Sequence, residues 1–158
     1  MRKVSVIVGV ADEREVPAGV LSEIHMSFRE VKDVQLEFVV VRQAPGSPVD
    51  LTMTTGDFVA IFDAVGGYDP TDVRRVLAPL LDGEADVVLG REPGAGLSLR
   101  ERATNSLLGW VAGPLLRTDF GGGRVGLRAF RREALGLPVR ALRVVEVTVS
   151  YQESAVPP

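Results

Sequence analysis

Apolar and polar positions along this chain follow two different periods, and each period predicts a different kind of element. Alternation or an unbroken β-branched run predicts a buried strand, whereas apolar residues three and four apart predict a helix with one buried face. We therefore expect strands over residues 4–8, 34–41, 57–62, 85–90, 123–130 and 144–151. The same reading predicts helices over residues 17–31, 69–81, 98–116 and 131–135. Strands that alternate with helices predict an α/β domain with a mostly parallel sheet flanked by helices.

Local signals mark the start of the second predicted helix. Asp69 stands where an N-cap is expected, Pro70 occupies the first helical position, and Asp72 places an acid at the positive end of the helix. The pattern predicts that the side chain of Asp69 caps this helix.

The composition fits one globular domain, which we expect over residues 1–153, with a disordered tail over residues 154–158. The chain has no cysteine, which excludes disulfides, thiolate nucleophiles and Cys-ligated zinc. A net charge of −3 gives no reason to expect a nucleic-acid partner.

The apolar runs are too short for a membrane-spanning helix. The run at the N-terminus ends at Ala11 and acids follow directly, which indicates a strand rather than a signal peptide. The apolar run over residues 107–116 is far below the ~20 residues that a spanning helix needs. We expect a cytoplasmic protein.

The segment over residues 118–135, TDFGGGRVGLRAFRREAL, carries the most specific pattern in the chain. It resembles the signature T-D-T-x-S-G-F-R-A-F-R-R-E-A-L of family 2 glycosyltransferases of the dolichol- or polyprenyl-phosphate mannosyltransferase type. Four further blocks are similar to that family and stand in its order: VSVIVGVADERE, DFVAIFDAVGGYDP, ADVVLGREPG and VVEVTVSYQE. Several blocks in the right order are more specific than one motif.

The resemblance implies a trimmed GT-A (nucleotide-diphospho-sugar transferase) fold and a function. A hexose would pass with inversion from a sugar nucleotide to a polyprenyl-phosphate-like acceptor, with a divalent metal, Mg²⁺ or Mn²⁺, on the leaving diphosphate. By the same resemblance, Asp63 would be the metal ligand, and Asp12 and Glu13 would seat the nucleotide. Three arginines would bind phosphate: Arg91, Arg128 and Arg131. Asp119 would be a carboxylate beside the reaction centre.

The departures from the family fall on the donor side. Val65 stands at the second acid of the Asp-x-Asp pair, and Gly67 stands at the following Gln. Arg42 and Gln43 replace an acidic pair, and Arg42 cannot accept a hydrogen bond. Only 15 residues, 42–56, separate the second strand from Asp57, where the family has a further helix. These losses predict a weakly held metal.

Each site residue also has a purely structural interpretation. Asp63 could be a turn acid satisfied by the backbone of Gly66 and Gly67, and Asp119 a loop acid that caps nearby amides. The arginines could be solvated surface residues, and Asp69 is more readily a cap than a displaced metal ligand. The helix over residues 98–116 could lie at a membrane interface, although a core helix is favoured.

Two functions from different classes therefore stay open. The first is a glycosyltransferase with a sugar nucleotide and a lipid phosphate as partners and a peripheral membrane contact. The second is a catalytically degenerate relative that binds a partner protein, a lipid phosphate or a membrane surface. The metal motif distinguishes them: because its second acid is replaced by Val65, it favours the second function, whereas the family-like fold favours glycosyltransferase ancestry.

Overall fold

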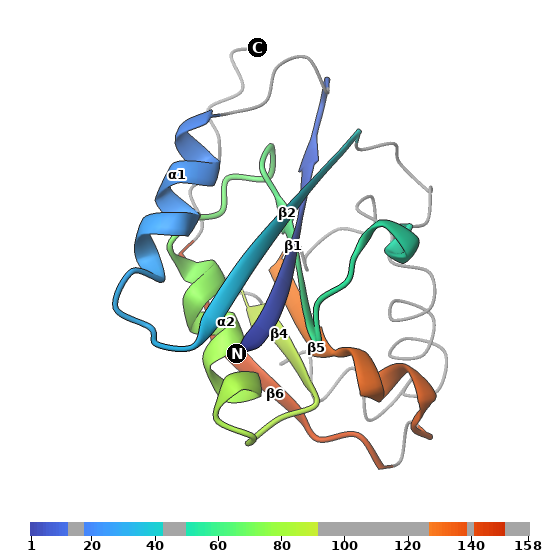
Figure 1. The fold of residues 1–158 in the computed structure, drawn as a ribbon. Coiled ribbons are helices and arrows are strands. Elements are labelled where there is room, and N and C mark those ends of the chain that lie inside the picture. The colour runs from blue at the N-terminus through green and yellow to red at the C-terminus, as the bar shows by residue number, and fades with distance from the viewer. Residues whose placement is uncertain (13–17, 43–49, 92–126, 139–140, 151–158) are drawn as a thin grey trace.

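The computed structural model describes residues 1–12, 18–42, 50–91, 127–138 and 141–150 (Figure 1). Six strands form one sheet: β1 (Arg2–Val10), β2 (Val34–Arg42), β3 (Phe58–Asp63), β4 (Val87–Arg91), β5 (Leu127–Arg131) and β6 (Val144–Thr148). The described helices are α1 (Ala18–Ser27) and α2 (Asp72–Leu81), with short 3-10 helices η1 (Leu51–Met53) and η2 (Arg132–Gly136). The predicted α/β class is confirmed.

The strand order is β2-β1-β3-β5-β4-β6. β1 runs parallel to β2 and β3, β4 runs parallel to β6, and β5 runs antiparallel to both of its neighbours. The expected mostly parallel sheet is therefore correct, with β5 as the reversed strand among those described. Because the other strands point the same way, their carboxyl ends share one edge, at which β5 begins.

Alternation along the strands builds a core on each face of the sheet. Valines of β1, Phe62 of β3 and Leu127 of β5 pack on one face with apolar residues of α1 and α2. These helices cover the same side of the sheet in Figure 1. The intervening residues, such as Ile7, Ile61 and Phe130, form a second cluster on the other face with Ala134 of η2. Successive strand side chains point to opposite faces, so one strand supplies both clusters.

The start of α2 follows the local signals of the sequence. Asp69 Oδ1 accepts hydrogen bonds from the backbone N–H of Thr71 at 2.9 Å and from the Thr71 hydroxyl at 2.7 Å. The regular helix begins at Asp72, three residues later than predicted, and ends at Leu81. The Asp69 side chain therefore satisfies a backbone donor just before α2, but the N-cap residue is Thr71, whose side chain makes no capping hydrogen bond, so the predicted N-cap lies two residues too early.

A polar network ties the short connection between β2 and β3 to the amino end of the sheet. The Glu37 carboxylate of β2 accepts hydrogen bonds from the Ser5 hydroxyl and from the N–H and hydroxyl of Thr55. These bonds, opposed by partial burial and helped by Lys3, lower the pKa of Glu37 from 4.5 to about 2. The ionised form of Glu37 is thus stabilised in the folded protein.

This network predicts a loss of stability in acid. The pKa of Glu37 is lower in the folded state, so its contribution is present above pH 4.5 and disappears as the pH falls toward 2. Between pH 6 and pH 3 this shift in pKa corresponds to about 2 kcal/mol before solvent screening is considered, so Glu37→Gln should reduce the loss seen in urea denaturation by about 1 kcal/mol. The exposed control Glu30→Gln should leave the loss unchanged, and an equal loss in all three proteins would contradict this role of Glu37.

Candidate functional site

The carboxyl edge of the sheet gathers the charged residues that the sequence marked on β1, β3 and β4. In the register of the sheet Gly9 pairs with Asp63, and the N–H of Ala64 donates to the Gly9 carbonyl at 2.9 Å. Asp63 therefore lies next to the chain that leaves β1 and reaches Asp12. Arg91 ends β4 at the same edge. Open α/β sheets bind their ligands outside the carboxyl ends of the strands.

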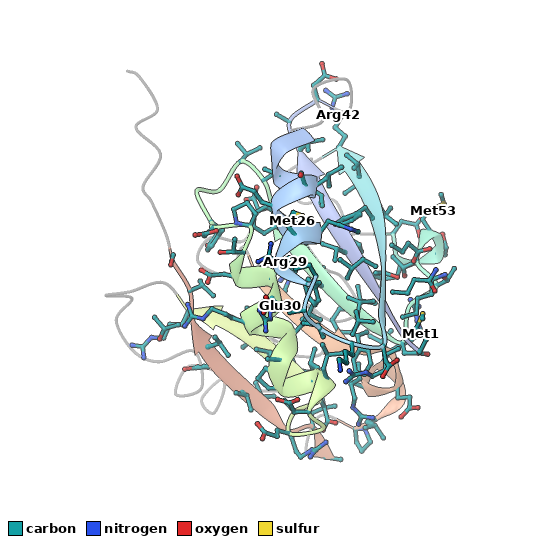
Figure 2. The ribbon with its side chains drawn as sticks, turned by 60° about the vertical axis from the view of Figure 1, so that its left-hand side comes forward. Met1, Met26, Arg29, Glu30, Arg42 and Met53 are labelled. Carbon is teal, nitrogen blue, oxygen red and sulfur yellow. The ribbon has the colours of Figure 1, made fainter. Side chains whose placement is uncertain are left out.

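Figure 2 gives the orientation of this edge. Arg42, the last residue of β2, lies at one end of the sheet, and Met1, which precedes β1, lies toward the other. In the register, Arg42 pairs with Val10 at the carboxyl end of β1. A guanidinium thus stands at the position that corresponds to an acidic pair in the family that the sequence resembles, and it can donate hydrogen bonds there but not accept them.

Asp63 sits in a tight turn. Its Oδ1 accepts a hydrogen bond from the Val65 N–H at 2.9 Å, and the side chain is half-buried. A Cβ placed on Gly66 would lie 2.7 Å from Asp63 Oδ2 and 2.9 Å from Cε2 of Tyr68, so this position has room only for glycine. Gly67 follows with φ of +81°, a conformation that favours glycine. Asp63 therefore fixes its turn, and an ionised carboxylate has lone pairs for further ligands.

Asp63 alone can hold a metal ion only if other ligands, such as water and substrate phosphates, complete the coordination shell. Within the described part of the chain, no three side chains of Asp, Glu and His group as metal ligands. Val65, at the position of the second acid, exposes 53% of its surface. Mg²⁺ often takes one or two protein carboxylates and completes its shell with water and substrate phosphates. Asp63 therefore fits a divalent metal that is held mainly by the diphosphate of a bound nucleotide.

Arg128 lies near this edge, because its partner in β3 is two residues before Asp63. It pairs with Ile61 of β3 and with Leu89 of β4, and it is buried, with 9% of its surface exposed. Asp63 and Arg91 each follow one of those partners by two residues, so strand alternation places Asp63, Arg91 and Arg128 on the same face of the sheet. Guanidinium groups bind phosphate oxygens in a bidentate manner.

Arg131 does not join this group. Because β5 is antiparallel, its last residue, Arg131, pairs with Phe58 at the amino edge, away from Asp63. Its Nε donates to Asp86 Oδ1 at 2.9 Å, and its Nη1 lies 3.0 Å from Glu133 Oε2. The three arginines that the resemblance assigns to phosphate therefore do not lie together, because Arg91 and Arg128 are near the carboxyl edge and Arg131 is at the amino edge.

The partner of Arg131 is a buried carboxylate that sequence reasoning missed. Burial would raise the pKa of Asp86, but the backbone and guanidinium of Arg143 and the guanidinium of Arg131 donate to it and lower the pKa to about 2. Asp86 falls within the predicted strand over residues 85–90, but its partners Arg131 and Arg143 are remote in the sequence, so no local pattern indicates the ion pair. Asp86 and Arg131 thus form an ion pair that joins the start of β4 to the end of β5 at the amino edge of the sheet.

Three of the expected site features lie outside the described residues. They are Glu13, Asp119 and the predicted helix over residues 98–116. Asp12, which directly precedes Glu13, is described and is half-buried just beyond the end of β1. In the described ranges, no helix is long and apolar enough to cross a membrane.

A small cavity of about 240 Å³ opens behind the Asp63 turn. It is lined by Glu23, Gly67, Tyr68, Asp69, Pro70 and Ser150. A more open groove of about 390 Å³ lies between α1 and α2, and Met26, Arg29 and Glu30 at its rim are labelled in Figure 2. The cavity thus lies between the loop after β3 and Ser150, the second residue after β6.

Comparisons with known proteins bear on the fold. No protein-family model matches the chain, and no curated protein matches it. Solved structures of glucosyl-3-phosphoglycerate synthase from Mycobacterium tuberculosis do match. The complex with Mn²⁺, UDP-glucose and phosphoglyceric acid has a TM-score of 0.51 at 19% identity, over 96% of this chain and 72% of the other. The complex with UDP has a TM-score of 0.52 at 19% identity, over the same shares of the two chains.

At these identities the similarity shows the fold and not the activity. The structures that match are nucleotide-sugar glycosyltransferases of the GT-A type. The narrower resemblance to polyprenyl-phosphate mannosyltransferases stays a prediction. The six-stranded sheet with its reversed fifth strand is therefore a GT-A fold, as the sequence blocks predicted.

Proposed function

We propose that this protein binds a sugar nucleotide with a divalent metal at the carboxyl edge of the sheet and transfers the hexose to a phosphate-bearing acceptor. The observation that carries this proposal is the placement of Asp63 beside the exit of β1 and on the same face as Arg91 and Arg128, within a GT-A fold. One acid and two guanidinium groups at one edge suit a metal-bound diphosphate.

Each residue of this edge has a proposed role. Asp63 holds the metal, which supplies electrostatic stabilisation of the leaving diphosphate when it is bound. Asp12 and Glu13 seat the nucleotide, and Arg91 and Arg128 bind phosphate oxygens. An acceptor oxygen attacks the anomeric carbon as the bond from that carbon to the diphosphate oxygen breaks, so the nucleoside diphosphate leaves and the configuration inverts.

The acceptor is proposed from its phosphate group. The sequence resemblance suggests a polyprenyl phosphate, and the glucosyl-3-phosphoglycerate synthase structures contain phosphoglyceric acid. A phosphate group is common to both, and Arg91 and Arg128 suit it. Asp119, next to the triple glycine 121–123, is proposed to orient the acceptor or to accept its proton.

A second function is favoured by one specific observation. The N–H of Val65 is used to hold Asp63 in its turn, and the Val65 side chain is an exposed apolar group where a second acid would bind metal. A relative that has lost tight donor binding would keep the fold and act as a binding module for a phosphate-bearing partner.

Titration with UDP-glucose and Mn²⁺ tests the proposal. Bound donor should raise the free energy of unfolding by ~2.7 kcal/mol at a hundredfold excess over the dissociation constant. Asp63→Ala should abolish this rise because it removes the carboxylate that holds the metal. Val65→Asp should strengthen binding by restoring a second acid at an exposed position.

A matched control separates this role from a general charge effect. Asp82 is an exposed carboxylate at the far end of α2, and Asp82→Ala should bind donor as the unaltered protein does. Donor binding that survives Asp63→Ala would refute the metal role of Asp63. Absence of binding by the unaltered protein, with binding by Val65→Asp, would refute donor binding by the unaltered protein and support the degenerate module.

A further inference from the structure

A buried carboxylate, Asp72, joins the start of α2 to the chain that leaves β6. Only 3% of the Asp72 surface is exposed. Its Oδ2 accepts a hydrogen bond from the Ser150 N–H at 2.6 Å, and its Oδ1 accepts one from Arg75 Nη1 at 3.1 Å. A charged acceptor gives a shorter and stronger hydrogen bond than a neutral one. The backbone at Ser150 is therefore held firmly against the first turn of α2.

The residues around Ser150 are tied to the candidate site on two sides. The carbonyl of Ser150 accepts a hydrogen bond from the N–H of Asp69 at 3.4 Å, in the loop that begins at Asp63. The preceding N–H, of Val149, donates to the carbonyl of Arg91 at 2.9 Å. The chain leaving β6 thus connects the loop after β3 to the end of β4.

The loop itself transmits this constraint to Asp63. Gly66 lies against both the Asp63 carboxylate and the ring of Tyr68, and Tyr68 is buried. The cavity of about 240 Å³ lies beside the same loop, between Gly67 and Ser150. Because atoms that face a cavity have fewer packing partners, the loop depends more on its hydrogen bonds.

We propose that Asp72 is a positioning residue for the candidate donor site. By holding Ser150, Asp72 fixes the loop over residues 64–71, and with it the Asp63 carboxylate, relative to Arg91. This inference rests on the proposed function and deepens it, because it assigns the geometry of the metal ligand to a residue that does not touch the donor.

Two measurements on Asp72→Ala test the proposal. The first is amide hydrogen exchange without ligand: the amides of Val65 to Asp69 and of Ser150 should exchange about tenfold faster, as expected for the loss of one charge-assisted hydrogen bond. The second is calorimetric titration with UDP-glucose and Mn²⁺, in which the dissociation constant should rise about tenfold.

Three further variants show whether the bond to Ser150 is responsible. Asp72→Asn keeps an oxygen that can accept from the Ser150 N–H, so it should restore most of the loop protection and of the affinity. Arg75→Ala removes only a half-exposed ion pair and should have little effect on either measurement. Asp86→Asn removes the charge of another buried carboxylate, at the amino edge of the sheet. It should lower the free energy of unfolding and leave both the amide exchange of the Asp63 loop and the donor affinity unchanged. Should Asp72→Ala fail to fold, Asp72→Glu displaces the same oxygens and takes its place.

The outcomes separate this inference from the proposed function. Unchanged exchange in Asp72→Ala, or faster exchange with unchanged donor affinity, overturns the positioning role while the proposed function stands. If the unaltered protein binds no donor at millimolar UDP-glucose with Mn²⁺, the proposed function fails. The exchange of Val65 to Asp69 then decides alone whether Asp72 positions the Asp63 loop: faster exchange supports it, and unchanged exchange overturns it.

Discussion

Replacing Asp86 by alanine should lower the free energy of unfolding by roughly 2–3 kcal/mol, because it removes charge-assisted hydrogen bonds from Arg131 and Arg143 and leaves the Arg143 N–H without its acceptor. Asp86 accepts hydrogen bonds from the Arg143 N–H at 2.7 Å and from Arg131 Nε at 2.9 Å, and its side chain is 3% exposed. Without the carboxylate, two guanidinium groups would face each other beside an unsatisfied backbone donor. Urea denaturation near pH 7 measures the loss.

The control for this prediction shares one of the arginines. Glu133 also pairs with Arg131, but its side chain is 84% exposed, so Glu133→Ala should cost at most about 0.5 kcal/mol. Asp86→Asn keeps one accepting oxygen and should fall between the two. Similar losses for Asp86→Ala and Glu133→Ala would show that the buried ion pair does not hold β4, β5 and β6 together.

Gly56→Ala should destabilise the fold by about 3 kcal/mol through overpacking. A Cβ at Gly56 would lie 2.6 Å from the Ser5 backbone nitrogen, 2.7 Å from Ser5 Oγ and 2.9 Å from the Lys3 carbonyl oxygen. The backbone of β1 cannot move away without disturbing its pairing with β2 and β3. The same substitution would also disturb the hydrogen bond from the Gly56 N–H to Ser5 Oγ at 2.8 Å. Thermal and urea denaturation would measure the effect.

A glycine with open surroundings provides the comparison. Gly19 lies in α1, and a Cβ there would meet nothing within 4 Å. Gly19→Ala should stabilise the protein by about 0.5–1 kcal/mol, because alanine favours the helix and restricts the unfolded chain. If the two substitutions had effects of the same sign, close approach at Gly56 would not be the cause.

Sequence periodicity predicted most of the described fold because strands and helices are marked by local patterns. The six strands and both α-helices lie within or close to the predicted ranges, and Asp69 satisfies a backbone donor just before α2. Asp63 directly follows the predicted strand over residues 57–62, and it lies at the carboxyl edge because it ends β3, a strand that runs parallel to β1. The predicted helix over residues 17–31 is shorter in the structure, where α1 spans Ala18–Ser27.

The direction of β5 and the partners of its arginines were not available from local patterns. Arg128 and Arg131 look alike in the sequence, yet the antiparallel pairing of β5 puts Arg128 near the candidate site and Arg131 beside Asp86 at the other edge. The roles of Asp72 and Asp86 likewise depend on residues more than 40 positions away.

The sequence by itself determined the alternation of strands and helices, the end of the third strand next to Asp63 and the absence of a second acid at Val65. These features depend on residue type and on neighbours a few positions apart. Only the tertiary structure decided which charged residues meet, because strand order and direction bring together residues that no local spacing relates. It brought Asp63, Arg91 and Arg128 to one face, removed Arg131 from that group, and buried Asp72 against Ser150.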